Sequence, residues 1–189
     1  MKYEILEANN YYHIFNQGNN GENIFIEEIN YSYFLKLLKK YILPIADVFS
    51  YCLLKNHFHL LVRIKDIQEG KLISKAFSNF FNAYSKSINK KYNRSGSLFR
   101  DRFKRIKVKE EDYFKRLIVY INLNPVHHQF VSIIEEYKHS SYISLLSEKE
   151  TLLKREEVIL LFESRENLKY HLTQKKLELD EKMSALILE

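Results

Sequence analysis

The sequence has one cysteine, Cys52, and lacks any hydrophobic run of the length that a signal peptide or a membrane-spanning helix requires. A single cysteine excludes a disulfide framework and fits a reducing compartment. Internal repeats and low-complexity segments are absent as well. At 189 residues the chain can form one good hydrophobic core with a small appendage. We therefore expect one principal domain in the cytoplasm, with no membrane partner.

Charge of one sign is concentrated in the middle of the chain. The chain is rich in hydrophobic residues (46%), which excludes disorder, and its net charge of +6 indicates an anionic partner. Residues 71–116 contain fourteen Lys or Arg and four Asp or Glu, whereas residues 131–189 contain nine and twelve. Such a basic segment is often only a solvated surface. Here it is interleaved with Tyr84, Tyr92, Phe99 and Phe103, and cations mixed with aromatic rings are typical of a nucleic-acid surface.

Hydrophobic periodicity predicts an α+β fold. The order of elements is β-α-β-β-α-β-α, the ferredoxin-like arrangement of an antiparallel sheet with helices on one face. The expected strands are 11–16, 48–54, 57–64 and 103–108, and the expected helices are 27–43, 71–92 and 110–124. We predict a catalytic domain over residues 1–130. A C-terminal helical extension is expected over 131–189, with helices at 133–146 and 155–188.

The triplet His57-Phe58-His59 is the most informative motif. Side chains alternate along a strand, so His57 and His59 should share one face while Phe58 lies on the other. Two adjacent imidazoles offer two neutral nitrogen ligands to a divalent metal. A bare His-x-His pattern is weak by itself, and an isolated histidine in an apolar strand is usually a structural residue.

A second group of polar residues lies on the expected third helix. Tyr120 and Asn124 are four residues apart and share a helix face, with Arg116 one turn earlier. A phenol, an amide oxygen and a guanidinium in line could handle a phosphate. The alternative is that Tyr120 belongs to the core and that Asn124 caps the helix before Pro125.

Three segments resemble a known family. NHFHLL (Asn56 to Leu61), GSLFRDRFK (Gly96 to Lys104) and YINLNPV (Tyr120 to Val126) follow the order and spacing of the REP-associated tyrosine transposases. This group belongs to the single-tyrosine HUH transposases, which act on single-stranded DNA. The resemblance spans roughly residues 11–142. One departure is Leu54-Lys55, where many members have Met-Pro.

The resemblance implies a role for each matching residue. His57, His59 and Asn124 match the metal site, for Mg²⁺ or Mn²⁺, and Tyr120 matches the nucleophile that forms a 5′-phosphotyrosine. The implied activity is cleavage and rejoining of DNA beside hairpins by a bacterial protein that associates with the nucleoid when bound to DNA. Single-stranded or hairpin DNA is the expected partner, and a homodimer is possible. From the basic segment 71–116, and not from the resemblance, the expected DNA-binding residues are Arg94, Arg100, Arg102, Lys104, Arg105 and Arg116.

Two other functions stay open at this point. A non-catalytic ferredoxin-like nucleic-acid-binding regulator would explain the basic segment but not the coincidence of the histidines and Tyr120. A metal hydrolase would need a carboxylate near the histidines, and none is apparent in the strand pair. Among the other tyrosines, Tyr84 should be core, Tyr92 should contact DNA, and Tyr113 is the one credible substitute for Tyr120.

Overall fold

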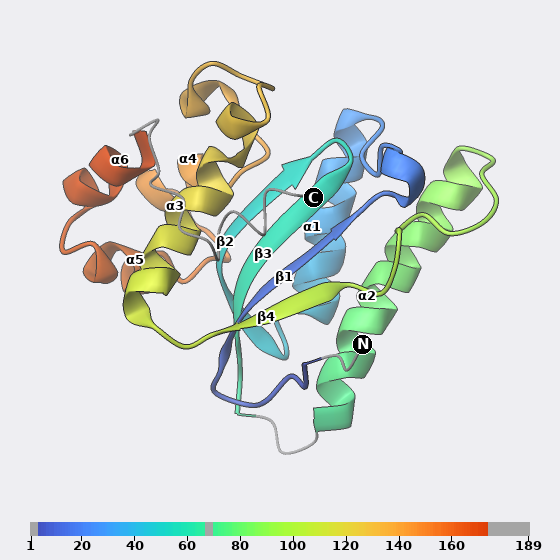
Figure 1. Ribbon diagram of the computed structural model, residues 1–189, viewed down its shortest axis with the longest axis horizontal. Coiled ribbons are helices and arrows are strands. Elements are labelled where there is room, and N and C mark those ends of the chain that lie inside the picture. The colour runs from blue at the N-terminus through green and yellow to red at the C-terminus, as the bar shows by residue number, and fades with distance from the viewer. Residues whose placement is uncertain (1–3, 67–69, 174–189) are drawn as a thin grey trace.

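The computed structural model describes residues 4–66 and 70–173 (Figure 1). Within this part of the chain, four antiparallel strands form one sheet in the order β2-β3-β1-β4. The central strands are β3 (His57–Ile64) and β1 (Tyr11–Gln17), and the edge strands are β2 (Ala46–Leu54) and β4 (Lys104–Val108). The predicted strands are confirmed, with ends that differ by one or two residues.

Helices cover both faces of the sheet (Figure 1). The first two, α1 (Glu28–Tyr41) and α2 (Gly70–Lys91), pack on one face against Ile14, Phe58 and Leu60. The third, α3 (Glu111–His127), packs on the opposite face, mainly over β2. The α+β class is confirmed. The expectation that the helices lie on one face holds for α1 and α2, whereas α3 forms a third layer above the histidine-bearing face.

The described residues after α3, up to residue 173, are less helical than predicted. The segment 133–146 contains a 3₁₀ turn (Ile134–Glu136) and a short helix, α4 (Tyr142–Leu146). The segment 155–188 contains α5 (Arg155–Leu161) and α6 (Arg165–Thr173), which are separated at Glu163, a residue with φ of 68°. Residues 174–188 of that prediction lie outside the described residues. These helices pack beside α3 and contribute to its core the buried side chains Leu145, Val158, Phe162, Leu168 and Leu172.

A search of the described helices finds none that is both long enough and apolar enough to cross a membrane.

Helix α3 continues past Asn124, where the sequence predicted its end, through Pro125 to His127. Proline in the final turn interrupts little of the ladder, because its missing N–H affects one hydrogen bond. The chain then ends the helix with paired bonds from Phe130 N–H to Pro125 O (2.8 Å) and from Gln129 N–H to Val126 O (3.1 Å). This is the Schellman arrangement, and it places Gln129 in the left-handed region with φ of 58°.

Replacing Gln129 by glycine should stabilise the protein. The side chain of Gln129 is exposed, and a residue with a Cβ is disfavoured in the left-handed conformation. We expect the free energy of unfolding to rise by about 1 kcal/mol, measured by urea unfolding followed by circular dichroism. Gln129→Ala is the matched control and should have little effect, since it keeps the Cβ. A destabilised glycine variant would contradict the prediction.

Candidate functional site

The two histidines of the His-x-His motif stand on the α3 face of β3. Strand alternation places Phe58 on the other side, in the core under α1 and α2, as predicted. His57 is half-buried, because it begins the strand directly after the Lys55-Asn56 turn, whereas His59 is 3% exposed. Their ring centroids are 5.3 Å apart. The prediction that both histidines share one face is confirmed.

His57 is oriented by hydrogen bonding from its own turn. Its Nδ1 lies 2.8 Å from Asn56 Oδ1, and its Nε2 lies 3.3 Å from Asn124 Oδ1. Both partners are amide oxygens, which only accept hydrogen bonds, and a neutral imidazole has one N–H. The shorter contact is at Nδ1, which favours the proton there and leaves a lone pair on Nε2. His57 Nε2 and Asn124 Oδ1 are therefore two electron-pair donors that face each other.

His59 makes its own buried contact with a third histidine. His59 Nδ1 lies 2.9 Å from Nε2 of His13, which comes from the neighbouring strand β1 and is 0% exposed. Phe15, opposite His59 in the register of β1 and β3, packs against both rings at centroid distances of 4.6 Å and 5.8 Å.

Tyr120 comes from α3 to the same cluster. Its ring centroid is 5.8 Å from that of His59 and 6.1 Å from that of His127, and the residue is 1% exposed. Asn124, one turn later, is 0% exposed. The structure therefore brings together the four residues His57, His59, Tyr120 and Asn124 that were selected from the sequence. Their roles as ligands and nucleophile stay predictions.

Burial keeps the imidazoles of this cluster neutral. It lowers the pKa of His57 to about 4 and that of His13 to about 3, and it lowers the pKa of His59 well below the usual 6.5. Neighbouring histidines add repulsion, His128 toward His57 and His13 toward His59. The pKa values of His127 and His128 are lowered by burial too. At neutral pH these rings can therefore offer lone pairs.

This donor set fits a divalent cation. Neutral imidazole nitrogens and an amide oxygen suit Mn²⁺ and are acceptable to Mg²⁺, and they leave the double charge of the cation almost undiminished. The proposed set contains two histidines and one amide. Among residues 4–66 and 70–173, no group of three or more His, Cys, Asp or Glu side chains is arranged to hold a metal ion.

A buried polar network fixes α3 to the sheet between Tyr120 and Asn124. Asn122 Nδ2 donates to Ser50 Oγ on β2 (3.0 Å), and Ser141 Oγ donates to Asn122 Oδ1 (2.8 Å). Ser50 and Ser141 hydroxyls are 3.0 Å apart, and Ser141 Oγ also accepts from Tyr51 N–H. The side chains of Ser50, Asn122 and Ser141 are all buried, so this network sets the position of α3 above the histidines.

The predicted DNA-binding residues are distributed over both sides of the edge strand β4. Lys104 is exposed on the histidine face, 5.6 Å from the Phe15 ring centroid, whereas Arg105 lies over Phe103 on the α2 side. The remaining members differ in exposure: Arg100 and Arg102 are exposed, Arg116 is half-buried on α3, and Arg94 forms an ion pair with Glu22. Because β4 is an edge strand, its two sides meet along its outer margin.

The other tyrosines occupy well-defined places. Tyr84 is a core residue, as predicted, and donates a hydrogen bond to Ile24 O (2.7 Å). Tyr92, which was expected to contact DNA, is half-buried and donates to Asn30 Oδ1 (3.0 Å). Tyr113 is 6% exposed in the core under α3.

Three histidines of the cluster were missed by the sequence analysis. His13 lies on a strand whose register against β3 could not be known in advance. His127 and His128 lie beyond Asn124, where the sequence predicted the end of the helix. The ring of His128 approaches that of His57 to a centroid distance of 4.8 Å. The sequence feature that could have pointed to these residues is the histidine content, because five of the seven histidines of the chain lie in this cluster.

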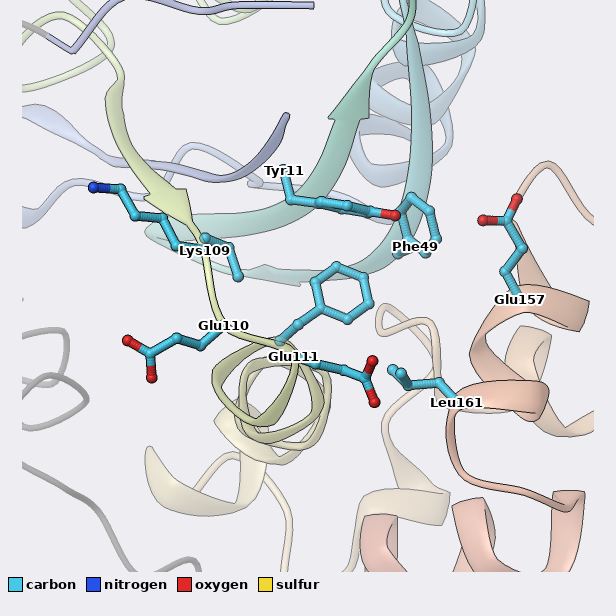
Figure 2. A pocket seen from close by; sticks show the side chains of 9 residues that line it. Tyr11, Phe49, Lys109, Glu110, Glu111, Glu157 and Leu161 are labelled. Carbon is cyan, nitrogen blue, oxygen red and sulfur yellow. The ribbon is translucent and has the colours of Figure 1, made fainter. Parts of the chain in front are cut away.

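A separate cavity of about 250 Å³ lies at the start of α3 (Figure 2). Figure 2 shows Glu110, Glu111 and Glu157 around it, with Tyr11 and Phe49 from the sheet. Tyr120 lies nine residues after Glu111 on α3, which is roughly 14 Å at the rise of an α-helix. The carboxylates of this cavity are therefore not part of the histidine site.

Comparisons with known proteins identify the fold. No protein-family model matches the chain, and no curated protein matches it. Among solved structures, the fold is similar to that of a REP-associated tyrosine transposase bound to a REP hairpin. The TM-score is 0.63 and the sequence identity is 11%, over 78% of this chain and 86% of that one. At this identity the likeness concerns the fold, which this chain shares with that transposase.

Proposed function

We propose that this protein cleaves and rejoins single-stranded DNA through a covalent bond to Tyr120. The observation that carries the proposal is the convergence of Tyr120, His57, His59 and Asn124 from two distant segments on one face of the sheet. The likeness to a hairpin-bound transposase supports DNA as the substrate. The three motifs that resemble that family include all four residues.

In the proposed reaction, the Tyr120 oxygen forms a bond to phosphorus and the bond from phosphorus to the 3′-oxygen breaks. Overall, the phenol proton passes to the departing 3′-oxygen, which leaves as a hydroxyl. His57, His59 and Asn124 would hold a divalent cation, which when bound polarises the phosphodiester and stabilises charge on its oxygens. The phosphotyrosine conserves the bond energy, so a second 3′-hydroxyl can attack it and rejoin the strand.

The basic segment supplies a surface for the DNA strand. A hollow of about 740 Å³ lies between α2 and residues 96–105, and it is lined by Arg102, Arg105, Phe99 and Phe103 together with short polar side chains. Guanidinium groups bind phosphates and aromatic rings stack on bases, so this lining suits a single strand. Lys104 links the hollow to the histidine face around β4.

The experiment that tests the proposal is a covalent trapping assay. Labelled hairpin oligonucleotides with randomised single-stranded flanks are incubated with the protein and Mn²⁺, then separated on a denaturing gel. We expect a protein–DNA adduct that forms with Mn²⁺ and does not form with EDTA. Cleavage without an adduct would indicate metal-assisted hydrolysis, and binding without cleavage would indicate a non-catalytic regulator. Either result overturns the proposal.

Binding of these oligonucleotides should weaken steeply with salt. If Arg100, Arg102, Lys104 and Arg105 each contact one phosphate, the logarithmic slope for a single strand is about −2.8, or roughly a 50-fold loss of affinity between 50 and 200 mM salt. Fluorescence anisotropy measures the slope. Arg102→Gln should reduce its magnitude by about 0.7, whereas Lys39→Gln, an exposed change on α1, should not alter it. A slope near zero would mean that the basic segment is only solvated.

A further inference from the structure

His13 is fully buried in the candidate site, yet the proposed reaction gives it no role. It is 0% exposed, lies between Phe15 and His59, and approaches His59 with nearly parallel rings at a centroid distance of 5.1 Å. Its Nδ1 is buried without a hydrogen-bond partner. Burying an imidazole nitrogen without a partner costs free energy, so the one hydrogen-bonding contact that His13 does make calls for an explanation. That contact is the 2.9 Å approach of its Nε2 to His59 Nδ1.

One proton lies between these two nitrogens, because at 2.9 Å two lone pairs would repel each other whereas an N–H and a lone pair form a hydrogen bond. In the first arrangement His59 Nδ1–H donates to His13 Nε2, and His59 Nε2 is left with a lone pair. In the second, His13 Nε2–H donates to His59 Nδ1, and His59 Nε2 must carry a proton. Only the first arrangement allows His59 Nε2 to bind a cation, since a protonated nitrogen has no lone pair to offer.

His57 offers a comparison. Its shorter contact is from Nδ1 to Asn56 Oδ1, an acceptor only, which favours the tautomer of His57 with an unprotonated Nε2. A partner that accepts from Nδ1 would give His59 the same tautomer. A neutral acceptor also differs from a carboxylate, because it adds no negative charge that would reduce the field of a cation at a phosphate.

We propose that His13 is a positioning residue that accepts the hydrogen bond from His59 Nδ1 and thereby holds His59 in the tautomer with a free Nε2. The inference rests on the proposed role of His59 as a ligand, but the tautomer itself exists in the metal-free protein. Phe15 supports the pair by packing against both rings. His13 does not touch the reacting atoms in this account.

The decisive measurement is the tautomer of His59 in metal-free protein, read from ¹⁵N-labelled histidine by long-range proton–nitrogen correlation. We expect the Nδ1–H form in the wild type. It should persist in His13→Gln, whose amide oxygen can accept the same bond, and be lost in His13→Leu, which has no acceptor. Observation of the Nε2–H form of His59 in the wild type overturns the proposal, whether or not the leucine variant folds.

Mn²⁺ binding, followed by the electron paramagnetic resonance signal of the free ion, gives a second readout. The dissociation constant should rise roughly 10- to 100-fold in His13→Leu and change only a few-fold in His13→Gln. His171→Leu, an exposed change on α6, is the matched control and should bind as the wild type does. A wild-type protein that binds no Mn²⁺ would overturn the proposed metal site while the tautomer measurement still decides the role of His13. Equal Mn²⁺ affinity in the wild type and a folded leucine variant would overturn the positioning role alone.

Discussion

Replacing Tyr120 by phenylalanine is expected to abolish covalent attachment and cleavage of DNA. The substitution removes one oxygen atom and leaves the ring that packs between His59 and His127. Binding of hairpin DNA should stay within a few-fold of wild type, because phosphate contacts from the basic segment do not involve this hydroxyl. The adduct assay on a denaturing gel measures the first effect, and fluorescence anisotropy measures the second.

Two other tyrosines provide controls for this result. Tyr84→Phe removes a hydroxyl that bonds to Ile24 O, so it should lower stability but leave the adduct intact. Tyr113→Phe should also leave the adduct intact. An adduct that persists in Tyr120→Phe and disappears in Tyr113→Phe would assign the nucleophile to Tyr113 instead. Loss of DNA binding in Tyr120→Phe would make Tyr120 a structural residue.

Acid should unfold the protein mainly through the histidine cluster. Burial lowers the pKa of His57 to about 4 and that of His13 to about 3, from 6.5, and it lowers the pKa of His59 well below 6.5. A histidine with a lowered folded pKa stabilises the fold above its unfolded pKa. As the pH falls from 6.5, the pKa in the unfolded chain, to the lower pKa in the folded protein, that stability is progressively lost. A group that is protonated in the unfolded chain and neutral in the folded protein contributes a slope of about 1.4 kcal/mol per pH unit. His13 and His57 together therefore lower the free energy of unfolding by about 3 kcal/mol per pH unit, and His59 acts in the same direction.

Urea unfolding at pH values from 7 to 4.5, in the presence of a chelator, measures this slope. His13→Gln removes one of the titrating groups and should reduce the slope by about 1.4 kcal/mol per pH unit, whereas His171→Gln on the exposed face of α6 should not. The pKa values of Glu27 and Glu28 are also lowered, by hydrogen bonds to Lys91 and Lys138, but these carboxylates titrate mostly below this range. A stability that is constant over the range would contradict the burial of neutral histidines.

Local pattern was sufficient to predict most of the fold. Alternation in His57-Phe58-His59 and in Phe103 to Val108 predicted strands correctly, because successive side chains of a strand point to opposite faces of the sheet. The predicted end of α3 at Asn124 was wrong. Pro125 is tolerated in the final turn of the helix, and the helix is closed after His127 by a Schellman motif at Gln129. The placement of α3 on the second face depends on tertiary contacts such as the Asn122 network, which have no local signature.

The candidate site also contains residues that could be predicted from local sequence and residues that depend on tertiary contacts. His57, His59, Tyr120 and Asn124 were predicted from spacing and resemblance, and the structure brings them together. His13 could not be predicted, because its position beside His59 follows from the register between β1 and β3. Arg105 was grouped with Lys104 in the sequence, but strand alternation turns the two toward opposite faces of the sheet.

The burial of Tyr120 implies that the proposed reaction is gated by a conformational equilibrium. Attack requires the phenol oxygen within about 3.5 Å of phosphorus, and a residue that is 1% exposed cannot reach DNA without movement of its ring or of α3. Only DNA that binds the open conformation more tightly than the closed one can shift this population. The apparent affinity for a cleavable strand is reduced by the fraction of open molecules. A strand that binds both conformations equally is held by the basic surface and is cut only as often as the resting population of open molecules allows.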